Sequence, residues 1–123
     1  MNKTQCLGLV LLGFGAHCSA VSLSTGPVAA FPPEGTERVI WCVAQNLSGK
    51  TATVEAQVIN GSGEIVVSQT KAVLPFAKEW VVGMDAVYGG GLVDCRFIAP
   101  NKKIRGYLQV QDNYVTTLSQ EAR

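Results

Sequence analysis

Few side chains in this sequence could do catalytic chemistry. The chain of 123 residues has four cysteines and a single histidine, His17. Serine and cysteine nucleophiles usually need a histidine as general base, and most zinc sites include imidazole ligands. His17 lies in an N-terminal segment that we expect to be removed. Without it the chain lacks the residues for these reactions, so we predict that the protein is not an enzyme.

Asp85 and Asp94 are the best remaining candidates for acid-base chemistry, because they flank a run of three glycines at positions 89–91. A pair of carboxylates can exchange protons with a substrate or, together with carbonyl oxygens, bind Ca²⁺. Two acids beside a loop are nevertheless common by chance, and no stretch has the dense Asp and Asn pattern of a calcium-binding loop. We predict no catalytic residue, no metal site and no cofactor.

Residues 1–20 have the layout of a signal peptide. Lys3 precedes an uninterrupted apolar and small stretch at residues 6–16, which is followed by Cys18-Ser19-Ala20. Small residues at the two positions that signal peptidase reads place the cleavage after Ala20, and the apolar stretch is too short to span a bilayer comfortably. His17, directly before Cys18, argues against lipidation. The mature protein is predicted to be secreted or periplasmic, with no membrane attachment after cleavage.

Cleavage at this position would leave an electrically neutral protein. It removes Lys3 and lowers the formal net charge from +1 to about 0. Binding to nucleic acid needs a clustered excess of Lys and Arg. The densest basic segment, Lys102-Lys103 with Arg105, is more simply explained as a polar turn, so we predict no nucleic-acid partner.

Cys42 and Cys95 are the two cysteines that remain after cleavage. Export delivers a chain to an oxidising compartment, in which two cysteines are expected to form a disulfide. Each of them also falls on the apolar side of an alternating segment, as the ends of a buried bridge must. Closing a loop of this length stabilises a fold by about 4 kcal/mol in the chain-entropy description.

The pattern of residues 37–123 is typical of short β-strands. Apolar and polar residues alternate with the period of two of a strand that has one buried face. A glycine-bearing segment at residues 61–63 predicts a hairpin between two such runs. In a later run we expect Trp80, Val82 and Met84 to share one side. The predicted runs are residues 39–43, 50–60, 64–70, 71–76, 78–84, 92–99, 104–112 and 113–119.

Residues 21–36 form a separate segment that is rich in Pro, Gly and Ser. Pro27 and Pro32-Pro33 disfavour both a helix and a central strand, so we expect a loop or a loosely paired edge. The regular spacing of turns downstream, without any helical period, predicts an all-β fold. We expect an antiparallel, immunoglobulin-like β-sandwich of about seven strands in residues 37–123.

The sequence also resembles known exported proteins. Its cysteine spacing is similar to that of immunoglobulin-like domains, in which a disulfide joins the two sheets. A closer resemblance is to small exported bacterial proteins of uncharacterised function. The matching residues are Cys42-Val43 with Asn46, Gly63-Glu64-Ile65-Val66, and Cys95-Arg96-Phe97 with Lys102-Lys103. This resemblance implies export and a disulfide-linked sandwich, and it implies no particular activity.

Two groups of residues are candidate binding surfaces. Alternation places Trp41 opposite Cys42, on the outer face of its sheet, where Tyr107 and Ile59 would also project. Together these three would form an exposed apolar patch of the kind that binds a partner, unless a loop covers it. Tyr88, beside the three glycines, is the second candidate because loop tips of sandwiches often bind ligands. The alternative for this loop is plain flexibility.

These observations favour a secreted, non-catalytic module that binds a protein or a carbohydrate. The alternative is a structural or assembly subunit that pairs with another chain through an edge strand, for which residues 22–35 are the candidate segment. The sequence leaves the oligomeric state open.

Overall fold

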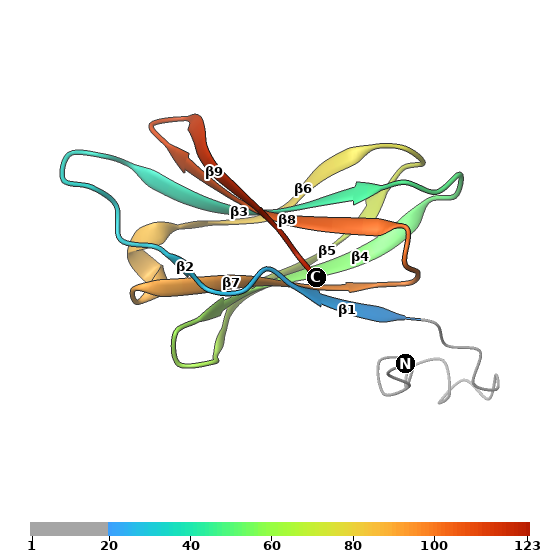
Figure 1. The fold of residues 1–123 in the computed structure, drawn as a ribbon, viewed down its shortest axis with the longest axis horizontal. Coiled ribbons are helices and arrows are strands. Elements are labelled where there is room, and N and C mark those ends of the chain that lie inside the picture. Colours follow the sequence, from blue (N-terminus) through green and yellow to red (C-terminus); the bar gives the residue numbers. More distant parts are fainter. Residues whose placement is uncertain (1–19) are drawn as a thin grey trace.

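Two antiparallel β-sheets packed face to face make up the fold, which is described for residues 20–123 by a computed structural model (Figure 1). The predicted signal peptide lies outside the described residues except for its last residue. The first sheet has the order β1-β7-β4-β5, with the short β2 also paired to β7, and the second has the order β6-β3-β8-β9. The predicted all-β sandwich is therefore confirmed.

Most strands follow the predicted runs, but β5 joins the run at 64–70 to the first residues of the run at 71–76, whose remainder is a turn. The short 3₁₀ helix η2 occupies Ala86–Gly89. Their bounds are β1 (Val21–Ser24), β2 (Val28–Ala29), β3 (Arg38–Asn46), β4 (Ala52–Asn60), β5 (Ile65–Val73), β6 (Lys78–Asp85), β7 (Leu92–Ala99), β8 (Ile104–Asp112) and β9 (Val115–Glu121).

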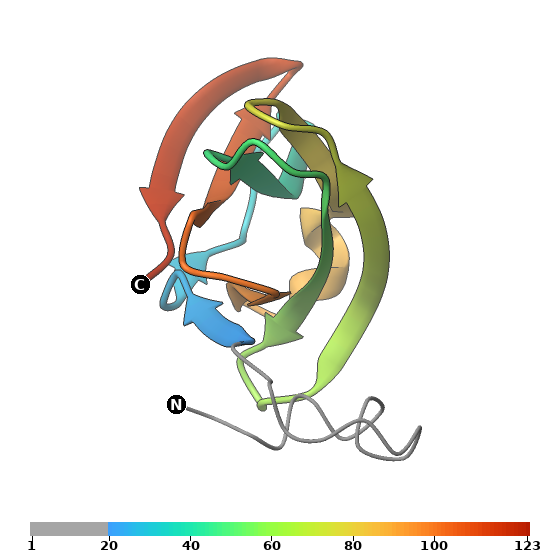
Figure 2. The same cartoon turned by 90° about the vertical axis from the view of Figure 1, so that its right-hand side faces the viewer.

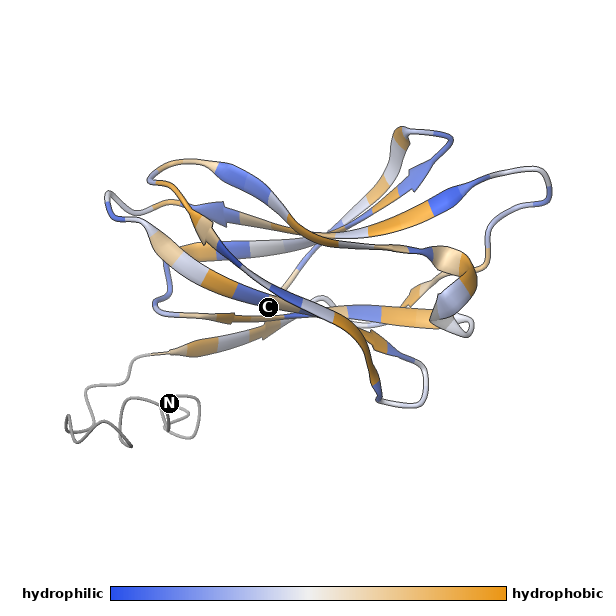
Figure 3. Ribbon diagram, turned by 180° about the vertical axis from the view of Figure 1, so that it is seen from behind, coloured by the Kyte–Doolittle hydropathy of each residue, from blue (hydrophilic) through white to orange (hydrophobic). Residues whose placement is uncertain are grey.

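Alternation along β4, β7 and β8 places every second side chain in the core. Figure 3 shows the resulting change between hydrophobic and hydrophilic residues along the ribbons. The inward positions of these three strands are almost fully buried, as the pattern predicts. They are Ala52, Val54, Ala56, Val58, Val93, Cys95, Phe97, Ala99, Ile104, Gly106, Leu108 and Val110.

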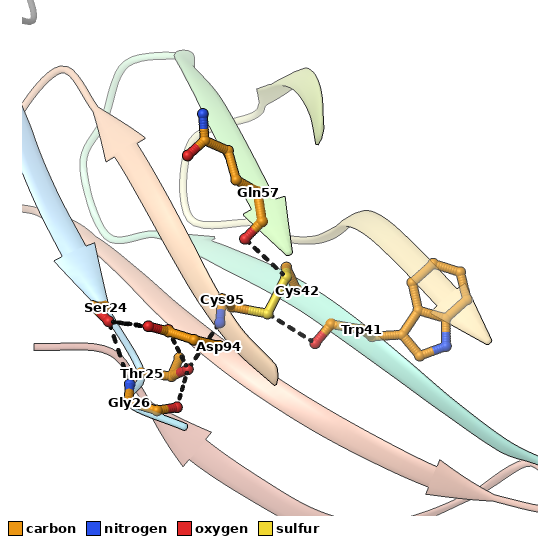
Figure 4. The surroundings of a disulfide bond; sticks show 8 residues. All are labelled: Ser24, Thr25, Gly26, Trp41, Cys42, Gln57, Asp94 and Cys95. Atoms are coloured by element: carbon orange, nitrogen blue, oxygen red, sulfur yellow. Dashed lines mark hydrogen bonds between the residues drawn. A yellow bond between two sulfur atoms is a disulfide. The ribbon is translucent and has the colours of Figure 1, made fainter. Parts of the chain in front are cut away.

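A disulfide between Cys42 in β3 and Cys95 in β7 joins the two sheets at the centre of this core (Figure 4). The two Cα atoms are 5.7 Å apart, and neither residue has exposed surface. The predicted pairing is confirmed. Immunoglobulin domains also bridge their sheets with a disulfide, but there the strand of the second cysteine and the next strand share a sheet. Here β7 and β8 lie in different sheets.

The segment of residues 21–36 lies in the same sandwich as the rest of the described chain. β1 and β2 form an edge by pairing with β7. Ser24 and Arg123 exchange two backbone hydrogen bonds of 3.1 and 2.9 Å, so the C-terminus closes the gap between the sheets on this side. Figure 2 shows β1 next to the C-terminus.

On the side of the sandwich opposite β1, Lys71 of β5 connects the first sheet to β6 of the second. Its ammonium donates a 2.8 Å hydrogen bond to the carbonyl of Trp80 and lies 3.5 Å from the carboxylate of Glu79. A lysine of this kind at an edge discourages pairing with another sheet. The edge strands β5, β6 and β9 each have a register irregularity in their pairing with the neighbouring strand.

A β-bulge in β6 changes the side on which Trp80 lies. Cys42 pairs with Val82 and Val43 pairs with Trp80, which leaves Val81 without a partner in the register. Because one extra residue reverses the alternation, Val81 and Val82 both join the core whereas Trp80 projects outward. The prediction that Trp80 shares a side with Val82 and Met84 is therefore wrong.

Replacing both Cys42 and Cys95 with alanine should lower the free energy of unfolding by about 4 kcal/mol, because the unfolded chain regains the entropy of an open loop. Urea unfolding of the variant and of the oxidised wild type measures this difference. Reduced wild-type protein is the control and should unfold near the variant. Equal midpoints for oxidised and reduced protein would contradict a stabilising role of the bridge.

Gly106→Ala should destabilise the sandwich by about 1–3 kcal/mol through overpacking. Gly106 faces the core of the second sheet, and a Cβ atom there would lie 2.4 Å from the ring of Phe97. Gly49→Ala is the matched control, since a Cβ atom at Gly49 meets nothing within 4 Å. Thermal unfolding of the two variants should separate them clearly, and equal melting temperatures would refute the contact.

Candidate binding site on the outer face of the second sheet

Three aromatic side chains from neighbouring strands gather on the outer face of the second sheet. They are Trp41 of β3, Trp80 of β6 and Tyr107 of β8, and each is partly or substantially exposed. Trp41 points outward because its neighbours Ile40 and Cys42 belong to the core. Figure 4 shows its ring directed away from the disulfide. We call this group the aromatic face.

Val43 forms the floor of the aromatic face. The register places Val43 between Trp80 on one side and Tyr107 on the other. Val43 has no exposed surface, although it lies outside the central core cluster. Its burial therefore comes from the outer face, where flanking side chains cover it. β3 is thus apolar on both sides, as expected for a central strand covered on each face.

The two tryptophans contact each other directly. Their ring centroids are 5.0 Å apart with an interplanar angle of 84°, which is the edge-to-face arrangement that aromatic quadrupoles favour. Gly83 makes room for this pair, because a Cβ atom there would lie 2.5 Å from the Trp41 ring. The face therefore presents a fixed aromatic platform, with the Trp80 side chain 37% exposed at its edge.

Polar groups border the platform on the side of Tyr107. The Tyr107 hydroxyl donates a 3.3 Å hydrogen bond to Oε1 of Gln45. The ammonium of Lys78 lies 5.3 Å from the centroid of the Tyr107 ring, within the range of a cation-π interaction. An Arg105–Glu121 ion pair of 2.7 Å lies beyond them on β8 and β9. The platform thus has hydrogen-bonding groups along one border.

Gln109 is the buried polar residue of this face. It stands directly opposite Trp41 in the register, and its exposed fraction is 8%. Its amide forms no hydrogen bond within residues 20–123. A buried amide without a partner is costly, and such groups usually mark a place for water or for a ligand.

The other predicted binding residues lie elsewhere. Ile59 is in β4 of the first sheet and is 5% exposed, so it does not join Trp41 and Tyr107. Alternation alone assigned it an outer side but could not tell which sheet it belongs to. Tyr88 is 72% exposed in η2 at one end of the sandwich. Gly90 and Gly91, which follow η2, adopt positive φ angles of 66° and 105°, a conformation that glycine tolerates without strain.

The two candidate acids lie in strands of different sheets, and each has a structural partner. Asp85 caps η2 by accepting a 3.1 Å hydrogen bond from the backbone of Val87. Asp94 in β7 accepts hydrogen bonds from the hydroxyls of Ser24 and Thr25 at 2.8 to 3.2 Å, which fastens the N-terminal edge (Figure 4). Within the described chain, no group of three or more metal-ligating residues occurs.

No family model matches the sequence, and neither the curated proteins nor the solved structures give a match. In residues 20–123 there is no helix of sufficient length and apolarity to cross a membrane.

The most strongly coupled charges join the ends of β3 and β8. The Arg38 guanidinium donates to both carboxylate oxygens of Asp112 at 2.7 and 2.9 Å and to the carbonyl of Phe31 at 2.9 Å. This pairing, with a further hydrogen bond from Thr117, lowers the pKa of the Asp112 carboxyl below its ordinary value, although partial burial opposes the change. The pair also fixes the loop that carries Phe31.

Acidification should remove the stabilisation that Asp112 provides. Because its folded-state pKa lies below the unfolded value of about 3.9, the contribution is present above that pH and is lost as the pH falls through the folded-state pKa. Urea unfolding of the wild type and of Asp112→Asn should differ near neutral pH and converge in acid. Glu34→Gln, which alters an exposed acid, is the control; a pH-independent difference for Asp112→Asn would contradict the assignment.

Proposed function

We propose that the protein is an exported, non-catalytic module that binds carbohydrate on the aromatic face. The observation that supports this most directly is the Trp41–Trp80 platform together with the largely buried Gln109, whose amide has no hydrogen-bond partner in residues 20–123. Sugar rings present an apolar side that packs on aromatic rings and hydroxyls that need hydrogen-bond partners. The flat surface of a protein partner could also pack on the platform, but its binding would not require a hydrogen bond to one largely buried amide.

Export is the second part of the proposal. A buried disulfide fits an oxidising compartment such as the periplasm or the extracellular space. The predicted signal peptide and the resemblance to small exported bacterial proteins support the same location. A module without catalytic groups in such a compartment would act by recognising a polymer at or outside the cell surface.

Assembly through an edge strand is the less favoured function. The segment proposed for strand exchange is already paired, because β1 bonds to β7 and to the C-terminus. The edge strands β5, β6 and β9 have irregular registers, a feature that discourages pairing between sheets.

Binding should be measured by affinity electrophoresis in gels that contain soluble xylan, β-glucan, galactomannan or dextran. We expect at least one polysaccharide to retard the wild type, and Trp80→Ala to weaken that binding about 30-fold, as for an aromatic side chain that contacts the ligand directly. Gln109→Leu should weaken it about 10-fold and leave the fold at least as stable, because the amide that it removes forms no hydrogen bond within residues 20–123.

Tyr88→Ala is the matched control, since it removes an exposed aromatic ring outside the aromatic face, and it should bind as the wild type does. Retardation that persists in Trp80→Ala and Gln109→Leu would place the site elsewhere. A folded wild type that none of the gels retards would count against carbohydrate and in favour of a protein partner.

A further inference from the structure

Three turns converge at one end of the sandwich, on the right in Figure 1, and Asn46 holds them together. Its side-chain amide donates to the carbonyls of Lys50 at 2.7 Å and Val73 at 3.0 Å. Its backbone amide donates to the carbonyl of Ala77 at 2.9 Å, and the next amide, of Leu47, donates to the carbonyl of Lys103 at 2.9 Å. The turns at residues 47–51, 74–77 and 100–103 thus form one rigid end.

Apolar side chains project from this end. Leu74 is 63% exposed, Phe76 is 73% exposed and Leu47 is 39% exposed. Leu74 and Phe76 belong to the same four-residue turn, which closes with a 3.1 Å hydrogen bond from the amide of Ala77 to the carbonyl of Leu74. Large apolar side chains held in water at a turn do not stabilise the fold, so they indicate a contact outside it.

Phe76 also has a backbone conformation that its residue type disfavours. Its φ angle is 58°, in the left-handed region. With Pro75 at the second position, the turn requires a positive φ at the third, where glycine or asparagine is preferred. A bulky residue in this conformation is an outlier, and such outliers concentrate at functional positions. Folding alone would favour a smaller residue here.

Three lysines lie at the same end of the sandwich as the apolar tips. Lys50, Lys102 and Lys103 are exposed and line an open groove with Ser48, Gly49 and Asn101. The three turns contain no acidic residue. Among the described residues, none of these lysines forms an ion pair, because the salt bridges involve Arg38, Lys71 and Arg105. In the sequence only Lys102-Lys103 is visible as a cluster; the fold adds Lys50 to it.

We propose that this end binds a lipid surface with anionic headgroups, into which Phe76 and Leu74 insert while the three lysines contact the headgroups. Surface binding of this kind needs both buried apolar area and cations, since either alone is weak. A soluble polyanion would use the lysines but leave the apolar tips in water. The aromatic face lies along the strands and stays accessible, so the inference is independent of the proposed function.

Co-sedimentation with vesicles tests the proposal. The wild type should bind vesicles of phosphatidylglycerol and phosphatidylcholine in equal parts and should not bind phosphatidylcholine alone. Lys102→Gln combined with Lys103→Gln should weaken binding about 30-fold. Phe76→Asn should weaken it about 10-fold or more and leave thermal stability unchanged or raised, because asparagine tolerates the left-handed conformation. Mass spectrometry should verify that all samples share the same N-terminus, so that residues 1–20 contribute equally.

Tyr114→Asn is the matched control. Tyr114 has a φ angle of 70° in the β8–β9 turn and is 83% exposed, but this turn is at the opposite end of the sandwich. Its replacement should not change vesicle binding. Wild-type affinity in Phe76→Asn would overturn the proposal, and if only the lysine variant failed, the end would be a polyanion site. Equal binding to both kinds of vesicle would overturn it as well.

Discussion

The bridge between Cys42 and Cys95 is the constraint on which the arrangement of the second sheet depends. It ties the centre of β3 to β7 and buries both sulfur atoms between the sheets. Successive side chains of a strand point to opposite faces, so a register slip by one residue would exchange the two faces. Once Cys42 points inward, its neighbours Trp41 and Val43 must point outward. The core and the aromatic face are therefore fixed by the same strand.

Local irregularities then determine what this regular frame presents to solvent. The extra residue Val81 turns Trp80 toward Trp41, and Gly83 leaves space for their contact. At the end of the strands, Asn46 uses its amide to satisfy carbonyls from two other segments. Fully bonded, buried polar groups of this kind specify a unique arrangement, because an alternative would leave them without partners. Both candidate surfaces thus rest on a few positions where the simple alternation of a sandwich is interrupted.

The sequence predicts well those features that depend on local alternation. β4, β7 and β8 have one face on the core, so their patterns give the strands, their inward residues and the position of Cys95. Prediction fails where distant segments decide the outcome. The bulge in β6 leaves no sign in its sequence, and the sheet that contains Ile59 depends on pairing with residues far along the chain. Val43 and Gln109 were missed for the same reason, because their burial comes from neighbouring strands. The apolar run at residues 39–43 was the only sign in the sequence that β3 is buried on both faces.

The most direct test of the account is a nuclear magnetic resonance titration of the ¹⁵N-labelled protein with the polysaccharide, or a fragment of it, that retards the protein in gels. If the aromatic face binds the polysaccharide, the indole N–H signals of Trp41 and Trp80 and the side-chain amide of Gln109 shift together at one common affinity, while the amides around Tyr88 and Phe76 stay in place. Shifts confined to η2 or to the turns at the strand ends, with unchanged indole signals, would contradict the claim that the aromatic face is the binding surface.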